Sequence, residues 1–256
     1  MFELIDSHCH LDFAVFDKSR VQILERALAH NVTRFVVPSV TASRFDTVLS
    51  MRDVSSRIAI AFGLHPCFMS AHQTSDLDLL RVYCQQYSPC AVGEIGLDFY
   101  LPDADREQQI LLLTQQLAVA QACGLPVILH VRKAHSVLLE ILKKMRFTQG
   151  GIVHAFSGSM EQAKEYLALG FKLGFGGTLT YEGSKRIRKL AAELPLSAIV
   201  LETDSPDMPL AGFQGQANAP ERVADVLQVL AQLRTEPLEV LAKATTDNVK
   251  QRLVLS

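Results

Sequence analysis

The chain of 256 residues carries 25 lysines and arginines against 27 aspartates and glutamates, so its formal net charge at pH 7 is −2. Hydrophobic residues make up 48% of the chain, enough for a sizeable core, which excludes a disordered protein and a disulfide-stapled miniprotein. This charge balance gives no overall basic field of the kind that indicates nucleic-acid binding, although it is compatible with a local patch. The five cysteines are scattered, which favours a reducing compartment over a secreted framework, and we expect a cytoplasmic protein.

Nothing in the sequence predicts association with a membrane. The longest apolar stretches, such as residues 58–64, are far shorter than the ~18 residues that a membrane-spanning helix needs. The first residues lack a basic region followed by an apolar core, so we expect no signal peptide. The sequence gives no indication of an obligate protein partner.

Short β-branched or apolar runs alternate along the chain with longer segments whose apolar residues recur at helical spacing. Eight runs are predicted strands, at residues 4–8, 34–39, 58–64, 90–95, 126–131, 151–155, 171–175 and 198–202. In the connection after the fourth run, Gly124 and Pro126 follow the last periodic residue and predict the end of a helix. Beyond Asp204 we expect a long loop and two helices, at about 219–233 and 237–252, that complete the outer layer.

This alternation predicts a TIM (β/α)8 barrel, a parallel α/β fold, formed by a single domain over residues 1–256. The alternative is an open doubly wound sheet. The glycine-rich dinucleotide fingerprint that usually follows the first strand of such a sheet is absent here, since the chain continues as Ser-His-Cys-His. The barrel is therefore favoured.

Polar side chains stand at or just beyond the ends of several predicted strands, where a parallel barrel brings its strands together at one mouth. They are His8, His10, His65, Glu94, His130, His154 and Asp204. The other histidines are His30 and His72, which we expect to be solvated, and His135, which we expect on a surface helix.

His8 and His10 are two residues apart, so both imidazoles point to the same side of a strand, whereas Cys9 points into the helix layer. A lone strand histidine is more often structural than a ligand, but four histidines with two carboxylates exceed the needs of one tetrahedral zinc. Such a set suits two divalent cations about 3.5–4 Å apart with a bridging carboxylate, for which Glu94 lies between the two groups. Zinc, manganese, iron and magnesium are compatible with these ligands. We expect Asp6, below His8 on the same face, to support the site.

Other residues near the expected mouth leave two interpretations open. Three glycines between residues 174 and 177 end the seventh strand, where barrels often bind phosphate, but close backbone packing explains them equally well. For Arg132 and Lys133, the two interpretations are that they bind an anion or that they are merely solvated. His65 is expected to contact substrate, with a loop-structuring role as the alternative.

These motifs resemble those of the TatD-type metal-dependent deoxyribonucleases, a family of amidohydrolase-like barrels. The matching segments are residues 5–10 (Ile-Asp-Ser-His-Cys-His), 63–66 (Gly-Leu-His-Pro), 93–98 (Gly-Glu-Ile-Gly-Leu-Asp), 130–132 (His-Val-Arg), 154–158 (His-Ala-Phe-Ser-Gly) and 202–206 (Glu-Thr-Asp-Ser-Pro). They occur in the family's order and run from residue 5 to about 221. Residues 206–209 and 212–216 are similar to the YjjV-like branch of the family.

The resemblance implies a TIM-type barrel with two divalent cations (magnesium, manganese or zinc) that hydrolyses phosphodiesters in DNA. It implies one cation held by His8, His10, Glu94 and Asp204, and another held by Glu94, His130 and His154. Two segments depart from the family pattern, because its His-Pro-His is here His-Pro-Cys at residues 65–67 and its basic Gly-Lys-Arg-Asn is Gly-Gln-Ala-Asn at residues 215–218. Both changes remove positive charge or hydrogen-bonding capacity near the mouth, which leaves DNA or a small phosphoester as the expected substrate.

The resulting hypothesis is a two-metal hydrolase in which the cations acidify a water molecule, and Asp204 orients it and accepts its proton. Glu94 bridges the cations, and His65 and Arg132 stabilise the negative charge that is added to the phosphate. The alternative enzyme is an amidase or lactonase that uses the same metal pair on a C–N or C–O bond. A non-catalytic metal-binding protein is disfavoured, because structural zinc sites are closed by four ligands that are often cysteines.

Overall fold

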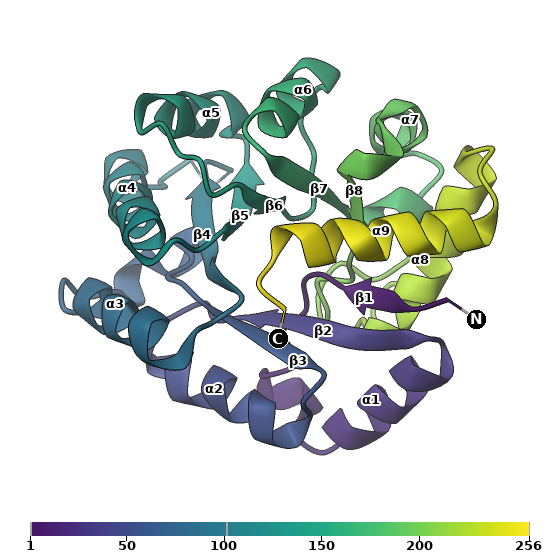
Figure 1. The fold of residues 1–256 in the computed structure, drawn as a ribbon, viewed down its shortest axis with the longest axis horizontal. Helices are drawn as coiled ribbons and strands as arrows, with labels where there is room; N and C mark the ends of the chain where they lie inside the picture. The colour runs from purple at the N-terminus through teal and green to yellow at the C-terminus, as the bar shows by residue number, and fades with distance from the viewer. Residues whose placement is uncertain (1, 101, 256) are drawn as a thin grey trace.

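A computed structural model describes residues 2–100 and 102–255 of the chain. Its strands form one sheet in which each strand pairs in parallel with the next along the chain. They are β1 (Leu4–Asp6), β2 (Val32–Pro38), β3 (Ile58–Phe62), β4 (Ala91–Asp98), β5 (Val127–Arg132), β6 (Gly151–Val153), β7 (Phe171–Phe175) and β8 (Ile199–Leu201). Figure 1 shows them in a ring with helices outside, which confirms the predicted TIM barrel and excludes the doubly wound order.

Helices connect the strands and cover the outside of the ring. They are α1 (Arg20–Ala29), α2 (Phe45–Val54), α3 (Asp76–Tyr87), α4 (Arg106–Cys123), α5 (His135–Lys144), α6 (Met160–Ala168), α7 (Lys185–Glu193), α8 (Val223–Leu233) and α9 (Leu238–Arg252). As predicted, α4 ends before Gly124, whose φ of 65° costs glycine nothing because it has no Cβ. Among the described residues, no helix combines the length and apolar character needed to cross a membrane.

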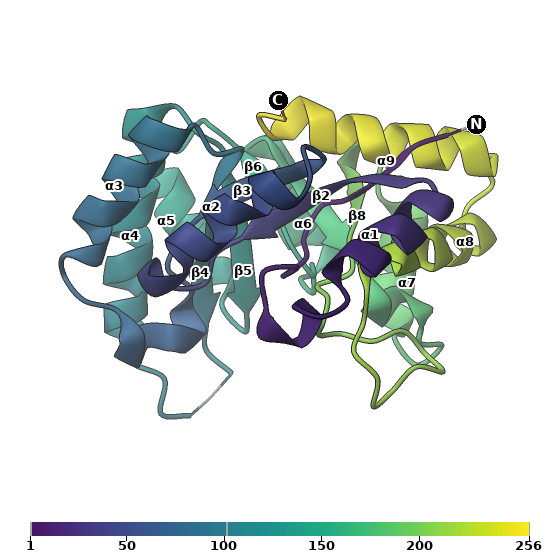
Figure 2. The ribbon, with the colours of Figure 1, turned by 90° about the horizontal axis from the view of Figure 1, so that it is seen from below.

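The last helix, α9, lies across one end of the barrel, so the expectation that it completes the outer layer is wrong. Figures 1 and 2 show it at the end where the N-terminus enters. Val249 of α9 and Leu253, which follows the helix directly, pack with inward-facing apolar side chains that include Ile5, Val36 and Val200. The helix therefore closes the barrel opposite the C-terminal ends of the strands. An apolar helix face packs equally well on a barrel end and on a neighbouring helix, which is why periodicity could not decide its position.

The ring closes between β8 and β1 through the segments that follow these two strands. Three backbone hydrogen bonds join them: Ser7 N–H to the Leu201 carbonyl (3.0 Å), Asp204 N–H to the His8 carbonyl (2.9 Å) and His10 N–H to the Ser205 carbonyl (2.7 Å). β1 is shorter than predicted, but these hydrogen bonds hold its continuation against the continuation of β8. Residues 8, 10 and 204 therefore lie side by side at the mouth.

The glycines at the end of β7 allow close packing. A Cβ on Gly174 would lie 2.2 Å from a carboxylate oxygen of Glu202, and a Cβ on Gly177 would lie 2.0 Å from the Met208 carbonyl oxygen. Both distances are far below van der Waals contact, so only glycine lets the segment after β8 approach this closely. Of the two interpretations of these glycines, the geometry favours packing over phosphate binding.

We expect Gly177→Ala to lower the free energy of unfolding by about 1–3 kcal/mol, because the added methyl group pushes against the Met208 backbone. Gly183→Ala, in the same connection between β7 and α7, is the matched control. Its Cβ would meet no atom within 4 Å, so it should leave stability unchanged or slightly higher. Urea titration compares the two variants, and equal free energies of unfolding would contradict the packing role.

Candidate metal centre

The six predicted metal ligands meet at the C-terminal ends of the strands. His8 and His10 follow β1, Glu94 lies in β4, His130 lies in β5, His154 follows β6, and Asp204 follows β8. Glu94 is at the centre of this group, and its side chain is only 2% exposed. The structure therefore brings together all the residues selected from the sequence, although three of the strands end before their ligand.

The two carboxylate oxygens of Glu94 face different imidazoles. Oε2 lies 3.2 Å from His8 Nε2 and 3.6 Å from His10 Nε2. Oε1 lies 2.8 Å from His154 Nε2 and 3.2 Å from His130 Nδ1. The carboxylate thus divides the histidines into the two groups that the family resemblance implied, as a ligand shared between two cations would.

Asp204 completes the group around His8 and His10. Its Oδ1 lies 3.4 Å from His8 Nε2 and 3.6 Å from His10 Nε2, and the two Nε2 atoms are 3.3 Å apart. The Asp204 φ of 57° lies in the left-handed region, which aspartate adopts more readily than most residues. Its side chain is 16% exposed, so it can be reached from the mouth, whereas Glu94 cannot.

The donor atoms fit divalent cations. Among the described residues, three sets of side chains have potential ligand atoms within 4.8 Å of one another: His8 with His10 and Asp204, His8 with Glu94 and His154, and His65 with Cys67 and His130. The Nδ1 atoms of His8 and His10 are buried without a hydrogen-bond partner in the described part of the chain, while the Nε2 atoms face each other. Two imidazole nitrogens at that distance need a proton or a cation between them. Imidazole combined with carboxylate is a set that zinc and manganese accept.

The histidines control the charge of Glu94. Burial alone would raise the pKa of this carboxyl group, but its interactions with His65, His154 and His8 and the hydrogen bond with His130 hold the pKa well below its usual range. Burial likewise opposes the charged form of His154, yet the neighbouring carboxylates raise the pKa of His154 well above its usual value. Glu94 is therefore ionised at neutral pH, as a metal ligand has to be.

Asp6 supports the ligands from below, as expected. Its carboxylate accepts hydrogen bonds from the Thr203 N–H (3.0 Å), the Thr203 hydroxyl (2.6 Å) and the His8 N–H (3.3 Å). It therefore ties the segment that carries His8 to the segment that carries Asp204. Acceptors of this kind behind the ligands fix ligand orientation.

Asp98 is a supporting carboxylate that the sequence analysis did not select. Its Oδ2 lies 3.0 Å from His130 Nε2, which turns Nδ1 of the same ring toward Glu94. Partial desolvation of the Cys67 thiol, together with this carboxylate 3.4 Å away, raises the pKa of Cys67 to about 12. Strand alternation was the available signal, because Asp98 is four residues after Glu94 and so points to the same side.

Glu202 is a second supporting carboxylate outside the predicted set. Its Oε1 accepts a hydrogen bond from the Ala155 N–H (2.5 Å) and lies 3.7 Å from His154 Nδ1. It therefore holds the loop on which His154 lies. Glu202 is two residues before Asp204, so the alternation of side chains along a strand would have placed both on the same side.

His65 lies among the ligands rather than out in the mouth. Its Nδ1 accepts a hydrogen bond from the Cys67 N–H (3.1 Å), so the ring proton is on Nε2, which lies 3.1 Å from Glu94 Oε1. In this tautomer His65 donates to Glu94. The His65 carbonyl accepts a hydrogen bond from His72 Nε2 (2.9 Å), so the expectation of a solvated His72 is wrong: it is half-buried and holds the loop of His65.

A cavity of about 540 Å³ opens over these ligands, and we call it the mouth cavity. His130, His154 and Asp204 line it, together with two cations, Arg132 and Arg186. Arg132 therefore lies where the sequence hypothesis requires it, next to the ligand groups. Arg186 was not selected from the sequence, because it comes from the start of α7 and reaches the mouth only through the fold.

His135 is buried, so the expectation that it lies on a surface helix is wrong. It is the first residue of α5, is 7% exposed, and lies between the Tyr166 hydroxyl (3.3 Å from Nδ1) and the Ser157 hydroxyl (3.5 Å from Nε2). The Phe156 ring packs on it with centroids 5.2 Å apart. Burial, with the nearby charge of Arg186, lowers the pKa of His135 to about 4, so the ring is neutral at neutral pH.

This imidazole predicts a pH dependence of stability. Its pKa is about 4 in the folded protein against the usual 6.5, so the unfolded chain binds the extra proton between these values and stability falls as the pH falls through this window. Between pH 7 and pH 5, we expect the free energy of unfolding of the wild type to fall by about 1–2 kcal/mol more than that of His135→Gln. Urea titration at both pH values measures this, with His30→Gln at an exposed position as control. An unchanged pH dependence in His135→Gln would show that the folded protein does not keep this ring neutral.

The whole chain is similar to known proteins of one family. Residues 5–253 match the family model described as TatD related DNase. A protein of Escherichia coli K12, named uncharacterized metal-dependent hydrolase YjjV, is 42% identical over 246 residues, and the match covers 95% of both chains. A Haemophilus influenzae relative, named uncharacterized metal-dependent hydrolase, is 38% identical over 255 residues, covering 96% of this chain and 97% of its own.

The fold comparison agrees with the sequence comparison. The crystal structure of YjjV, a TatD homologue from Escherichia coli K12, matches with a TM-score of 0.96 at 41% identity, covering 99% of this chain and 98% of its own. This confirms the resemblance seen in the motifs, including the resemblance to the YjjV-like branch. The chain therefore belongs to the TatD-related DNase family, in which the relatives it matches are named metal-dependent hydrolases.

Proposed function

We propose that this protein is a metal-dependent phosphodiesterase that cleaves DNA or short oligonucleotides at the barrel mouth. The observation that carries the proposal is the position of Glu94, whose two oxygens face two separate groups of imidazoles. Membership of a family described as TatD-related DNases supports a nucleic-acid substrate, and the names of the relatives support a metal.

The ligand groups of the mouth would hold two divalent cations, with magnesium, manganese and zinc as candidates. His8, His10, Glu94 and Asp204 would hold one, and Glu94, His130 and His154 would hold the other. When bound, such cations supply positive charge that lowers the pKa of a water molecule from about 15.7 towards 7.

Asp204 is the carboxylate best suited to orient the attacking water and accept its proton. It lines the mouth cavity, whereas Glu94 is buried beneath it. Burial raises the pKa of Asp204, but the neighbouring imidazoles of His10, His154 and His8 outweigh burial and keep the pKa below its usual value. The carboxylate is therefore ionised and free to accept a proton at neutral pH.

The two arginines of the mouth cavity would act on the phosphate. Arg132 and Arg186 line this cavity and would neutralise negative charge on the phosphate oxygens. For His65 we propose a positioning role in place of substrate contact, because its Nε2 donates to Glu94. It would hold the shared carboxylate in the orientation that serves both ligand groups.

The shared position of Glu94 predicts that one substitution weakens the binding of both cations. We expect metal-stripped protein to take up two zinc ions per chain and Glu94→Gln to bind each at least about tenfold more weakly, since a neutral amide replaces the shared carboxylate. Equilibrium dialysis, together with the rise in Tm on metal addition, measures the loss. Glu25→Gln makes the same change at an exposed position of α1 and should bind like the wild type. Two ions bound with unchanged affinity by Glu94→Gln would refute the shared position.

The proposed function predicts metal-dependent cleavage of an end-labelled DNA oligonucleotide. Metal-stripped protein should be inactive and should regain activity with magnesium, manganese or zinc, and Asp204→Asn should lower kcat about 100-fold or more because the proton acceptor is lost. Asp78→Asn, at an exposed position of α3, should keep full activity.

Two results would count against this function. Cleavage that survives Asp204→Asn would come from a contaminating nuclease, and the DNase proposal would then be withdrawn. Absence of cleavage by protein that binds two cations would favour the alternative hydrolase, which acts on C–N or C–O bonds with the same ligands.

A further inference from the structure

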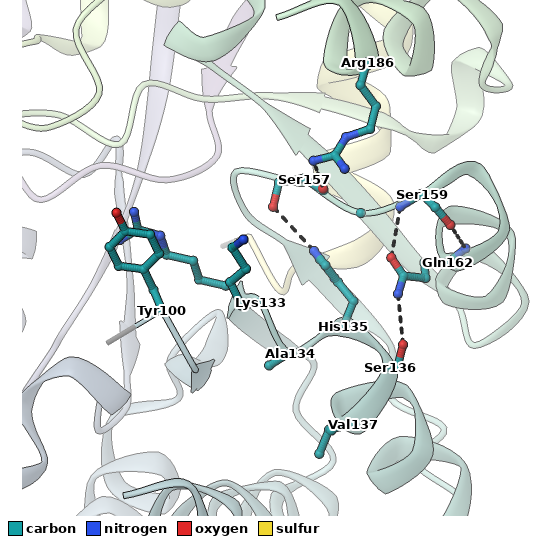
Figure 3. Close-up of a pocket in the computed structure, with 12 residues that line it drawn as sticks. Tyr100, Lys133, Ala134, His135, Ser136, Val137, Ser157, Ser159, Gln162 and Arg186 are labelled. Carbon is teal, nitrogen blue, oxygen red and sulfur yellow. Dashed lines mark hydrogen bonds between the residues drawn. The ribbon is translucent and has the colours of Figure 1, made fainter. Parts of the chain in front are cut away.

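A second cavity adjoins the mouth cavity, and Figure 3 shows the residues that line it. It has a volume of about 470 Å³ and lies between the loops that follow β5 and β6 and the first turn of α7. Arg132, Ser157 and Arg186 line both cavities, so the two are contiguous. A substrate seated over the metal ligands can therefore extend into the second cavity.

The charged side chains of this second cavity are all cations. Arg132, Lys133 and Arg186 line it, and no described aspartate or glutamate does. Over residues 2–100 and 102–255, none of these three forms an ion pair, whereas Arg20 and Arg26 are paired with carboxylates. The chain as a whole has a net charge of −2, so this concentration of unpaired positive charge does not follow from composition. The cavity is suited to an anion.

The cations are held in defined positions around the cavity. The Arg132 guanidinium lies 3.5 Å over the Tyr100 ring, and Arg186 Nη2 donates to the Ser157 carbonyl over 2.8 Å. Figure 3 shows the Lys133 side chain in the space between Tyr100 and Ser157. The Lys133 backbone has a φ of 59°, a left-handed conformation that is uncommon for lysine.

The Ser157 hydroxyl adds a possible donor to the cavity wall. The His135 ring lies between the Tyr166 hydroxyl, 3.3 Å from Nδ1, and Ser157 Oγ, 3.5 Å from Nε2; Figure 3 shows the contact with Ser157. In the tautomer that carries its proton on Nε2, the imidazole donates to Ser157 Oγ. The Ser157 proton can then turn toward an anion in the cavity.

We propose that this cavity is a second phosphate subsite, which binds the phosphate next to the one hydrolysed at the mouth. The proposal rests on the phosphodiesterase function and narrows its substrates to nucleotides with at least two phosphates. Guanidinium groups bind phosphate oxygens in a bidentate way, and the ammonium and hydroxyl donors add further hydrogen bonds. Such a subsite would let a chain without an overall basic field hold a polyanion, because the positive charge is concentrated where the next phosphate lies.

Dinucleotides that share one scissile bond but differ in terminal phosphates test the subsite. Thymidylyl-thymidine has a single phosphodiester, and two derivatives add a phosphate at the 5′ or the 3′ end. With metal-loaded wild-type protein at low salt, we expect one of the added phosphates to lower KM about tenfold or more, as one or two charge-assisted hydrogen bonds would. Lys133→Gln should abolish most of this gain. Lys189→Gln, which removes a charge from α7 outside the cavity, should keep it.

The outcomes separate the subsite from the phosphodiesterase function. If the three dinucleotides are hydrolysed with the same KM, or if Lys133→Gln keeps the full gain, the subsite is wrong and the function stands. If none is hydrolysed, cleavage of the end-labelled oligonucleotide decides on the function, and titration of the metal-loaded protein with thymidine 3′,5′-bisphosphate and with the two monophosphates decides on the subsite. Tighter binding of the bisphosphate that Lys133→Gln abolishes supports the subsite, and equal binding overturns it.

Discussion

The buried carboxylate of Glu94 is the group on which the rest of the site depends. An ionised carboxylate away from water is costly unless it is paired and hydrogen-bonded, and here four imidazoles, those of His8, His65, His130 and His154, lie between 2.8 and 3.2 Å from its oxygens. Its charge therefore favours the protonated form of each neighbouring imidazole and draws their nitrogen atoms toward it. Because β4 is buried along its whole length, this carboxylate stays away from water, and the other candidate ligands lie around it.

Closure of the barrel and assembly of the site use the same contacts. The hydrogen bonds between the continuations of β1 and β8 complete the ring and at the same time bring His8 and His10 beside Asp204. Asp6 reinforces this junction through its hydrogen bonds with Thr203. Since α9 covers the opposite end, the strand C-termini form the end of the barrel at which the candidate ligands and the mouth cavity lie.

Two regions of opposite electrostatic character lie next to each other at the mouth. Imidazoles and carboxylates gather at the strand ends, where they suit cations, and the adjoining cavity is lined by Arg132, Lys133 and Arg186, which suit an anion. The segments that the resemblance marked as departures, residues 65–67 and 215–218, contain no lysine or arginine. The cationic side chains of the adjoining cavity come from the end of β5, from the loop after it and from the start of α7. A phosphate-bearing substrate would complement both regions together.

The sequence by itself determined the order of strands and helices, and the residues that gather at the mouth, because both follow from local periodicity and from the rule that parallel strands end at one face. The same alternation would also have led to Asp98 and Glu202 as supporting acids. Only the tertiary structure decided that His65 donates to Glu94, that His135 is buried, that α9 closes one end of the barrel, and that Arg186 reaches the mouth. Each of these depends on segments that are distant in the chain and become neighbours only when the ring closes, and local periodicity carries no information about such neighbours.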